Sequence, residues 1–284
     1  MELKEIQAFQ RKMLRDVAEL CERHHIRYTI YCGTLLGAVR HGGFIPWDDD
    51  VDIAMPLKDY RRFLRLARRE LRETYFVQNY LTDPRVNILW TQLRANHTTE
   101  MRRELASWKK HWGIGIDIYP MLGVAEGEKG FARQKRALQL ASAFLCTDFS
   151  RFVGGKAAGW QVVIDALPPW LRSRIAHLFM LFAERDPDRH LRCCTLDMAP
   201  FESKYLRRDW DEMIWGDFDG LQVRMPKNYD KLLRAMYGNY MVLPPEEKRN
   251  GHGDGFGGMI WDAKRDYREY QRELAEAAGR PGKN

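Results

Sequence analysis

The sequence predicts an α+β protein in which short strands alternate with amphipathic helices. Residues 2–24 place apolar side chains three and four positions apart, the spacing of a helix that packs against a sheet. Residues 28–31 and 50–53 are short runs of the strand type. From about residue 127 to 190 the chain becomes largely helical. Together these features predict a small mixed sheet flanked by helices, with a helical insertion.

The next elements follow from apolar spacing and turn residues. A helix is expected from Pro56 to about Arg72, because proline suits the first helical position and an apolar stripe follows it. Residues 75–80 and 86–93 are predicted to be strands. The polar residues 96–111 are expected to form a loop or a short helix near the functional site.

Turn and cap residues also define the C-terminal part. Gly220 predicts a hairpin turn and residues 221–224 the strand that follows it. Residues 229–237 are predicted to form a helix that is closed by Gly238. The last residues, 262–284, are expected to form a polar helix and a frayed tail.

Composition limits the class of protein and of partner. The 284 residues are 45% hydrophobic and 30% charged, which is ordinary for a soluble globular protein. The net charge of +7 favours anionic partners such as nucleotides, phosphosugars or an anionic membrane, without choosing among them. No apolar run is long enough to span a bilayer, and the N-terminus lacks a signal-peptide core. The five cysteines form no CxxC pair and fit reduced thiols, so we expect a cytoplasmic protein.

The densest chemical signal is an acidic cluster at residues 48–52. In a strand, alternation would point Asp50 and Asp52 to one face, with Asp48 in the same parity and Asp49 on the other face. Carboxylates this close repel one another unless a cation lies between them. Hard oxygen ligands favour Mg²⁺ or Mn²⁺. The cluster therefore predicts a metal site of Asp50 and Asp52 with Asp48 assisting; the alternative is a solvated acidic turn.

Groups suited to binding a phosphate lie just upstream of the acids. Gly33 and Thr34 would form a turn that offers backbone N–H groups and a hydroxyl. Arg40 and His41 would add positive charge. One stretch of sequence therefore predicts both a metal site and a phosphate seat.

A further acid, Asp117, lies in the isoleucine-rich run at residues 113–120. A buried carboxylate without a partner is costly. Asp117 is therefore either a structural carboxylate with an arginine partner or a third active-site acid that faces Asp50 and Asp52 from a neighbouring strand.

Three motif regions resemble the LicD family, which includes fukutin and fukutin-related protein. Residues 33–53 read G-T-L-L-G-A-V-R-H-G-G-F-I-P-W-D-D-D-V-D-I, which is close to the signature of the family at almost every position. Residues 116–120 read I-D-I-Y-P, similar to a segment of these proteins. Residues 223–252 carry V-x-x-P, Y-D-x-x-L and P-P segments followed by a late histidine. The resemblance spans roughly residues 28–252.

The resemblance implies a polymerase β-like nucleotidyltransferase core and a Mg²⁺-dependent (or Mn²⁺-dependent) phosphotransferase. Such enzymes move a phospho-alcohol, such as phosphocholine, ribitol phosphate or glycerol phosphate, from a CDP-alcohol donor to a glycan or lipid-linked glycan acceptor, releasing CMP. The resemblance also implies that Asp117 is an active-site acid, which either ligates metal or takes the proton of the attacking hydroxyl. It makes Arg249 and His252 candidates for contact with the donor phosphate or the acceptor.

Two other functions stay open. The first is a nucleotidyltransferase that moves NMP from an NTP and releases pyrophosphate, so the leaving group discriminates it. The second is a non-catalytic protein that binds through its basic surface, with an affinity that falls steeply with salt; closely spaced acids argue against it. No nucleic-acid partner is expected. Peripheral contact with an anionic inner membrane face, through the apolar and basic segment 170–185, is left open.

The expected organisation follows from these elements and from the resemblance. It comprises a nucleotidyltransferase-like catalytic core at 1–126, a helical insertion at 127–200, a C-terminal part of the catalytic unit at 201–261, and a polar helix and tail at 262–284.

Overall fold

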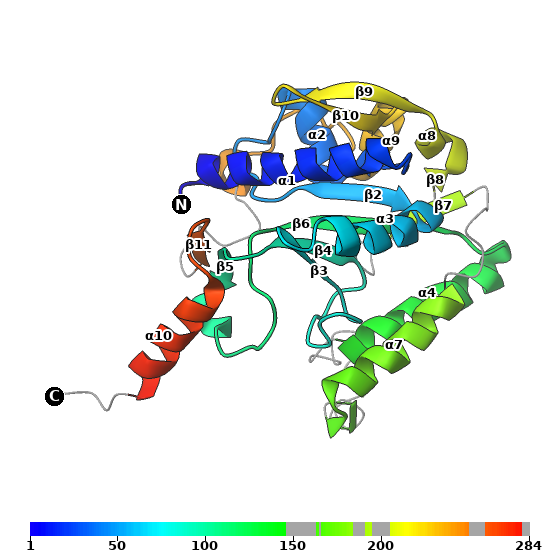
Figure 1. Cartoon of the computed structure of the whole chain (residues 1–284). Helices are drawn as coiled ribbons and strands as arrows, with labels where there is room; N and C mark the ends of the chain where they lie inside the picture. Colours follow the sequence, from blue (N-terminus) through cyan, green and yellow to red (C-terminus); the bar gives the residue numbers. More distant parts are fainter. Residues whose placement is uncertain (146–162, 165, 184–190, 195–204, 250–258, 280–284) are drawn as a thin grey trace.

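A computed structural model shows a mixed sheet that carries the long helices of the chain (Figure 1). The structure describes residues 1–145, 163–164, 166–183, 191–194, 205–249 and 259–279. In chain order the helices and strands are α1 (Leu3–Arg23), β1 (Thr29–Ile30), α2 (Cys32–His41), β2 (Asp52–Pro56), α3 (Leu57–Glu70), β3 (Tyr75–Gln78), β4 (Thr91–Ala95), β5 (Thr99–Arg102), β6 (Gly115–Gly123), α4 (Gly127–Leu145), α7 (Pro169–Ala183), β7 (Leu191–Cys194), β8 (Tyr205–Leu206), α8 (Arg207–Asp211), β9 (Met213–Phe218), β10 (Leu221–Pro226), α9 (Tyr229–Tyr237), β11 (Met259–Asp262) and α10 (Tyr267–Gly279), with short 3-10 helices at Arg103–Leu105 and Glu246–Lys248.

In the described part of the chain the main sheet has seven strands; five follow the order β1-β2-β6-β4-β3, and β7 and β8 pair off this path, with β8 next to β7. Strands β2 and β6 are parallel, and the other pairs are antiparallel. Strand β7 pairs with the C-terminal end of β6, beyond the residues that pair with β4. Strands β9 and β10 form a separate hairpin, and β5 pairs with β11. The sheet is therefore mixed, as the sequence predicts.

Helices cover both faces of the sheet, and the alternation of β2 shows how. Ile53 and Met55 belong to the main core, together with Val17 of α1 and Phe63 of α3. Ala54 belongs to a smaller cluster on the opposite face, with contributions from α8 and α9. Because side chains alternate along a strand, Asp52 shares the face of Ala54 and stays out of the main core.

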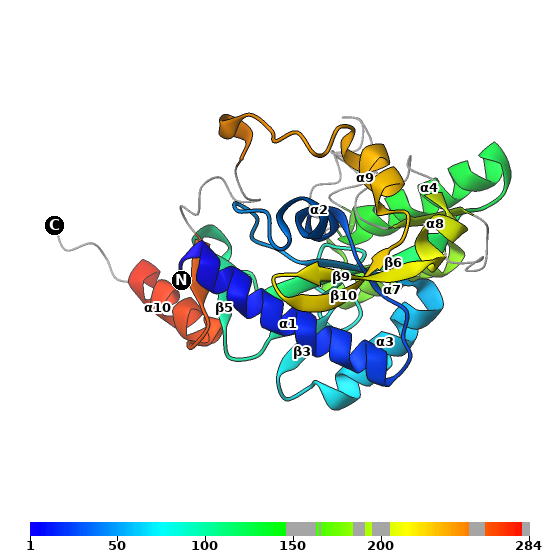
Figure 2. The ribbon, with the colours of Figure 1, turned by 90° about the horizontal axis from the view of Figure 1, so that it is seen from above.

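Figures 1 and 2 show the remaining layers. Helix α1 lies along the sheet, and the β9–β10 hairpin lies next to α1 and α2. Helices α4 and α7 form an antiparallel pair that projects away from α1, and α10 lies at the far end of the molecule beyond β5 and β11. No helix among the described residues is long and apolar enough to cross a bilayer.

Several predicted elements are confirmed. Helix α1 occupies the predicted range, as does α3, although Pro56 precedes the helix as its N-cap and ends β2. The β9–β10 turn contains Gly220 with a φ of 74°, and α9 ends at Gly238 with a φ of 65°. Glycine adopts positive φ without steric cost, so these residues did indicate a turn and a helix end. Residues 267–279 form the polar C-terminal helix.

Other expectations were wrong in position. The strand expected at residues 50–53 begins only at Asp52, and the strand expected at 86–93 occupies Thr91–Ala95. Residues 96–111 were expected to be a loop or a short helix, but they include strand β5. Its partner β11 lies about 160 residues further along the chain, so no local pattern marks the pairing. The range expected as a helical insertion contains α4 and α7 and also β7, which pairs with β6; the division into domains stays a prediction.

Candidate active site

Two of the predicted acids lie side by side on neighbouring strands. In the parallel register of β2 and β6, Asp52 is directly opposite Asp117. The backbone N–H of Asp117 donates a hydrogen bond of 2.8 Å to the carbonyl of Val51. Neighbouring strands are about 5 Å apart, and residues in register point to the same face. The sheet therefore holds both carboxylates on the face that α8 and α9 partly cover.

Helix α2 is tied directly to the start of β2. The backbone N–H of Asp52 donates a hydrogen bond of 2.8 Å to the hydroxyl of Thr34, and the N–H of Tyr31 donates to the carbonyl of Asp52 at 2.9 Å. Thr34 is 2% exposed. The first turn of α2, where Gly33 and Thr34 lie, is therefore fixed beside Asp52. The turn expected there is the N-terminus of a helix, and its predicted contact with a donor phosphate stays a prediction.

Replacing Thr34 by alanine is expected to lower the free energy of unfolding by about 1–3 kcal/mol, because the buried N–H of Asp52 loses its acceptor. Thr34→Ser keeps the hydroxyl and should cost much less. Urea unfolding of the two variants measures the difference. Equal losses in both variants would show that the methyl group of Thr34, and not this hydrogen bond, is what matters.

Asp48 approaches the same helix end from the loop before β2. A Cβ atom on Gly33 would lie 2.8 Å from Oδ2 of Asp48, so the glycine leaves room for this carboxylate at the first turn of α2. Asp48 is 7% exposed. A negative charge near a helix N-terminus is stabilised by the backbone N–H groups there. The predicted phosphate seat thus already has a carboxylate of the protein next to it.

The loop that carries the acids is held by two glutamines of α1. The Gln7 amide donates hydrogen bonds to the carbonyls of Ile45 and Asp48, at 3.3 and 2.8 Å. The Gln10 amide donates to the carbonyls of Asp49 and Gly115, at 2.8 and 3.2 Å. Neither residue is predicted from the sequence as part of the site, although Gln10 stands out as a polar residue within the apolar stripe of an amphipathic helix.

Residues 48–51 precede the strand, so the alternation argument does not apply to them. Asp50 and Asp49 both line a cavity that also reaches Asp117. The expected orientation of Asp49 relative to Asp50 therefore stays a prediction.

Burial and neighbouring charges together set the electrostatics of the site. Burial raises the pKa of Asp52, and the nearby charges of Asp50, Asp117 and Asp48 raise it further. Burial also raises the pKa of Asp117, against the opposing effect of Arg94. Each ionised acid therefore makes ionisation of the others more costly, and a cation placed between them would relieve the repulsion.

The carboxylate oxygens of these residues are suitable ligands for a hard divalent cation, although they do not supply a complete coordination shell. No three acidic, histidine or cysteine side chains within the described ranges are arranged as a ready metal-binding cluster. Mg²⁺ is typically held by one or two carboxylates, and waters and substrate phosphates complete its shell. The pair Asp52 and Asp117 suits that mode of binding, with Asp50 and Asp48 close by.

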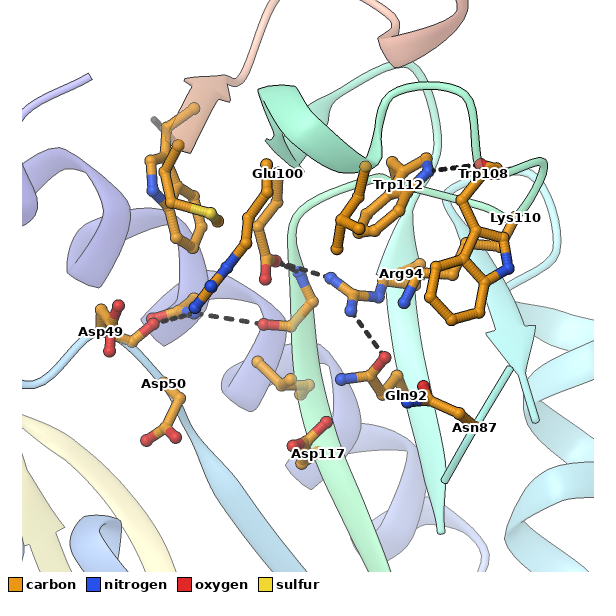
Figure 3. Close-up of a pocket in the computed structure, with 17 residues that line it drawn as sticks. Asp49, Asp50, Asn87, Gln92, Arg94, Glu100, Trp108, Lys110, Trp112 and Asp117 are labelled. Atoms are coloured by element: carbon orange, nitrogen blue, oxygen red, sulfur yellow. Dashed lines mark hydrogen bonds and ion pairs between the residues drawn. The ribbon is translucent and has the colours of Figure 1, made fainter. Parts of the chain in front are cut away.

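The cavity beside Asp50 and Asp117 has a volume of about 340 Å³. Its walls come from α1, from strands β4 to β6, from the loop before β6 and from β11. The charged and aromatic residues among them are Asp49, Asp50, Arg94, Glu100, Arg102, Trp108, Lys110, Trp112, Asp117 and Trp261. Figure 3 shows Asp49 and Asp50 on one side, Trp108 and Lys110 on the other, and Arg94 between them.

Arg94 organises the wall of this cavity. Its guanidinium donates hydrogen bonds to the side chains of Gln78, Gln92 and Glu100, at 3.1, 2.6 and 2.7 Å, and to the carbonyl of Gly113 at 2.9 Å. Arg94 is 4% exposed. A Cβ atom on Gly115 would lie 2.8 Å from its Nη1, so the glycine gives the guanidinium room to cross β6. Sequence reasoning missed both Arg94 and Glu100, because they meet only in the folded sheet.

The predicted basic residues gather at the opposite end of α2. The rings of His41 and Trp47 have centroids 6.2 Å apart, and the guanidinium carbon of Arg249 lies 5.6 Å from the centroid of Trp47. Arg40 donates a hydrogen bond of 2.7 Å to the carbonyl of Tyr240. Since α2 rises about 1.5 Å per residue, Arg40 lies about 9 Å along the axis from Thr34. These residues therefore form a separate basic group, and their role in substrate binding stays a prediction, as does that of His252, which lies outside the described residues.

Part of the chain that forms this site is similar to a known protein family. Residues 25–145 match the family described as LicD/FKTN/FKRP, nucleotidyltransferase domain. Over these residues the chain is similar to the LicD/FKTN/FKRP family. The match covers the first turn of α2, the acidic loop, Asp117 and most of the cavity wall, so the matched region contains the candidate active site.

Relatives of this family with assigned names include two kinds of transferase. The chain is 28% identical to the lipopolysaccharide cholinephosphotransferase LicD of Haemophilus influenzae, over 82% of this chain and 89% of that protein. It is 47% identical to the ribitol 5-phosphate transferase FKRP of human and mouse, over 17% of this chain and 10% of each of those proteins. The short FKRP match therefore concerns only a small part of either chain.

Proposed function

We propose that this protein is a Mg²⁺-dependent phosphotransferase that moves a phospho-alcohol from a CDP-linked donor to a glycan or lipid-linked glycan, with release of CMP. The observation that carries the proposal is the in-register pair of Asp52 and Asp117 beside the N-terminus of α2. The names of the LicD and FKRP relatives support transfer of a phospho-alcohol as the reaction. We also propose that the core has the polymerase β-like form expected for the family.

The position of each residue suggests its role in the reaction. The first N–H groups of α2 would orient the donor phosphates. Asp52 and Asp117, with Asp50 and Asp48 nearby, would hold Mg²⁺, which when bound neutralises charge on the transferred phosphate. If Asp117 does not ligate the metal, it would instead accept the proton of the attacking hydroxyl.

The first experiment is a thermal shift series with CDP-choline, CDP-ribitol, CDP-glycerol, CTP and UTP, each with and without Mg²⁺. A ligand that binds only the folded state raises the melting temperature. Metal-dependent stabilisation by a CDP-alcohol, followed by CMP release on adding acceptor, is the expected result. Stabilisation by nucleoside triphosphates alone, with pyrophosphate as product, would favour the nucleotidyltransferase function instead. No response to any of these compounds would contradict the proposed donor.

We also propose a peripheral contact with an anionic membrane through the α4–α7 surface. Leu178 and Leu181 of α7 are 66% and 45% exposed. Arg133 and Arg136 of α4 border an apolar groove that includes Leu178. Apolar side chains next to arginines match the interface of a bilayer that contains anionic lipids. Such a contact would bring the enzyme to a lipid-linked acceptor, and the cytoplasmic location stays a prediction.

Replacing Leu178 and Leu181 together by glutamate is expected to weaken binding to vesicles that contain phosphatidylglycerol by about tenfold, because two apolar contacts are lost and two negative charges are added. Vesicle flotation measures the bound fraction. Met241→Glu, at a position that is 55% exposed elsewhere on the protein, is the control and should bind as the wild type does. Equal binding by all three proteins would contradict the membrane contact.

A further inference from the structure

The aromatic wall of the cavity already holds a cation. The ammonium of Lys110 lies 4.1 Å from the ring centroid of Trp112 and 5.7 Å from that of Trp108. The indole N–H of Trp112 donates a hydrogen bond of 2.9 Å to the carbonyl of Trp108, which fixes the two residues relative to each other. Lys110 therefore occupies the kind of aromatic site that a ligand cation would need.

This arrangement opposes a quaternary ammonium in the same place. Such a group cannot donate hydrogen bonds and is recognised mainly by aromatic faces. Burial, together with the charge of Arg94, lowers the pKa of Lys110 to about 8, so the ammonium remains mostly charged at neutral pH. A second cation in the cavity would be repelled by the ammonium of Lys110, which lies against the rings of Trp108 and Trp112 that would otherwise bind it.

The same cavity offers hydrogen-bonding groups that hydroxyls would satisfy. Gln10 and Trp261 are among the residues that line it, and the side-chain oxygen of Gln10 and the indole N–H of Trp261 are buried. Neither atom has a hydrogen-bond partner within the described part of the chain. Gln10 is 1% exposed, and its amide nitrogen is already used on two backbone carbonyls. Leaving such an acceptor and donor unsatisfied is costly, and a hydroxyl can serve either one.

We propose that this cavity binds a neutral polyhydroxylated group and selects against a quaternary ammonium such as choline. The group is either the alcohol of the donor or a sugar of the acceptor, because both present hydroxyls to the same atoms. That the bound group takes part in the transfer reaction rests on the proposed function. Binding at the cavity itself can be measured without turnover. The volume of about 340 Å³ is within the range of small-molecule sites.

The test compares wild type with Lys110→Met, which keeps an apolar stem but removes the ammonium. Lys109→Met is the matched control, because Lys109 is exposed and does not line the cavity. Isothermal titration calorimetry with Mg²⁺ present measures binding of CDP-ribitol, CDP-choline and CDP. Methyl glucoside and methyl galactoside, titrated in the presence of CMP, probe the acceptor side.

If the donor alcohol occupies the cavity, wild type binds CDP-ribitol about tenfold more tightly than CDP-choline. In Lys110→Met the preference for CDP-ribitol over CDP-choline should then decrease or reverse, because the aromatic rings become available to choline. Lys109→Met should keep the preference of the wild type. If an acceptor sugar occupies the cavity, the two CDP-alcohols bind alike. In that case a methyl glycoside binds wild type and loses about fivefold or more in Lys110→Met.

Two results would overturn the proposal. One is tighter binding of CDP-choline than of CDP-ribitol by wild type. The other is a Lys110→Met variant whose affinity for every probe equals that of wild type. This result includes the case in which neither glycoside binds to wild type or to the variant. Failure of all cytidine compounds to bind would instead count against the proposed function, while the glycoside titrations would still report on the cavity.

Discussion

Asp52→Asn is expected to abolish transfer while leaving the protein folded. Asp52 lies in register with Asp117, and its pKa is raised by burial and by three neighbouring acids. Asparagine has nearly the same shape, so the hydrogen bond between the backbone of residue 52 and Thr34 should persist. The loss of one charged ligand should lower kcat by a factor on the order of 10³ or more. Transfer assayed as CMP release measures this effect.

The same variant should separate metal binding from stability. Removing one of several mutually repelling carboxylates should leave the melting temperature of the metal-free protein unchanged or raise it. The stabilisation of the wild type by Mg²⁺ should largely disappear, because a charged ligand is missing. Glu128→Gln, which removes an exposed acid far from the site in α4, is the control and should retain both activity and the response to Mg²⁺. An Asp52→Asn enzyme that keeps most of its activity would contradict the metal assignment.

Arg94→Met is expected to produce the largest loss of stability, about 3–5 kcal/mol of the free energy of unfolding. Arg94 is buried and donates hydrogen bonds to three side chains and one backbone carbonyl. Burial already raises the pKa of Glu100, and Arg94 opposes that shift. Without the guanidinium, the mostly buried Glu100 loses the cation that balances its charge. Urea unfolding measures the loss.

Three further variants test the cause of that loss. Arg94→Met combined with Glu100→Gln should recover part of the stability, because the uncompensated charge is then removed as well. Arg94→Lys should remain destabilised, because an ammonium cannot reproduce the fork of donors that guanidinium provides. Arg103→Met, at an exposed position nearby, should unfold like the wild type. A double variant no more stable than Arg94→Met would show that lost packing, not charge, explains the effect.

The local sequence was sufficient for features that depend on neighbouring residues. The apolar spacing of residues 2–24 specifies α1, because a helix brings positions three and four apart onto one face. Gly220 and Gly238 marked a turn and a helix end, because glycine tolerates positive φ. The run from Gly33 to Ile53, together with Asp117, was enough to indicate the family and to name the acids.

Only the tertiary structure decided how those acids and their surroundings are arranged. The register that places Asp52 against Asp117 depends on a strand pair whose members are 65 residues apart, since 117 minus 52 is 65. The acidic residues before Asp52 lie in a loop held by Gln7 and Gln10, which strand alternation could not predict. Thr34 proved to anchor β2 to α2, a contact that local propensity does not encode.

The cavity is the clearest case of a feature that no local pattern contains. Gln10, Arg94, Lys110 and Trp261 come from four separate elements, and each looks like an ordinary surface or core residue in the sequence. They converge because burying the apolar faces of α1, β5 and β11 leaves these polar groups facing one space. Sequence therefore determined which residues could do the chemistry, and long-range packing determined what stands beside them, because contacts between distant segments are set by the whole core.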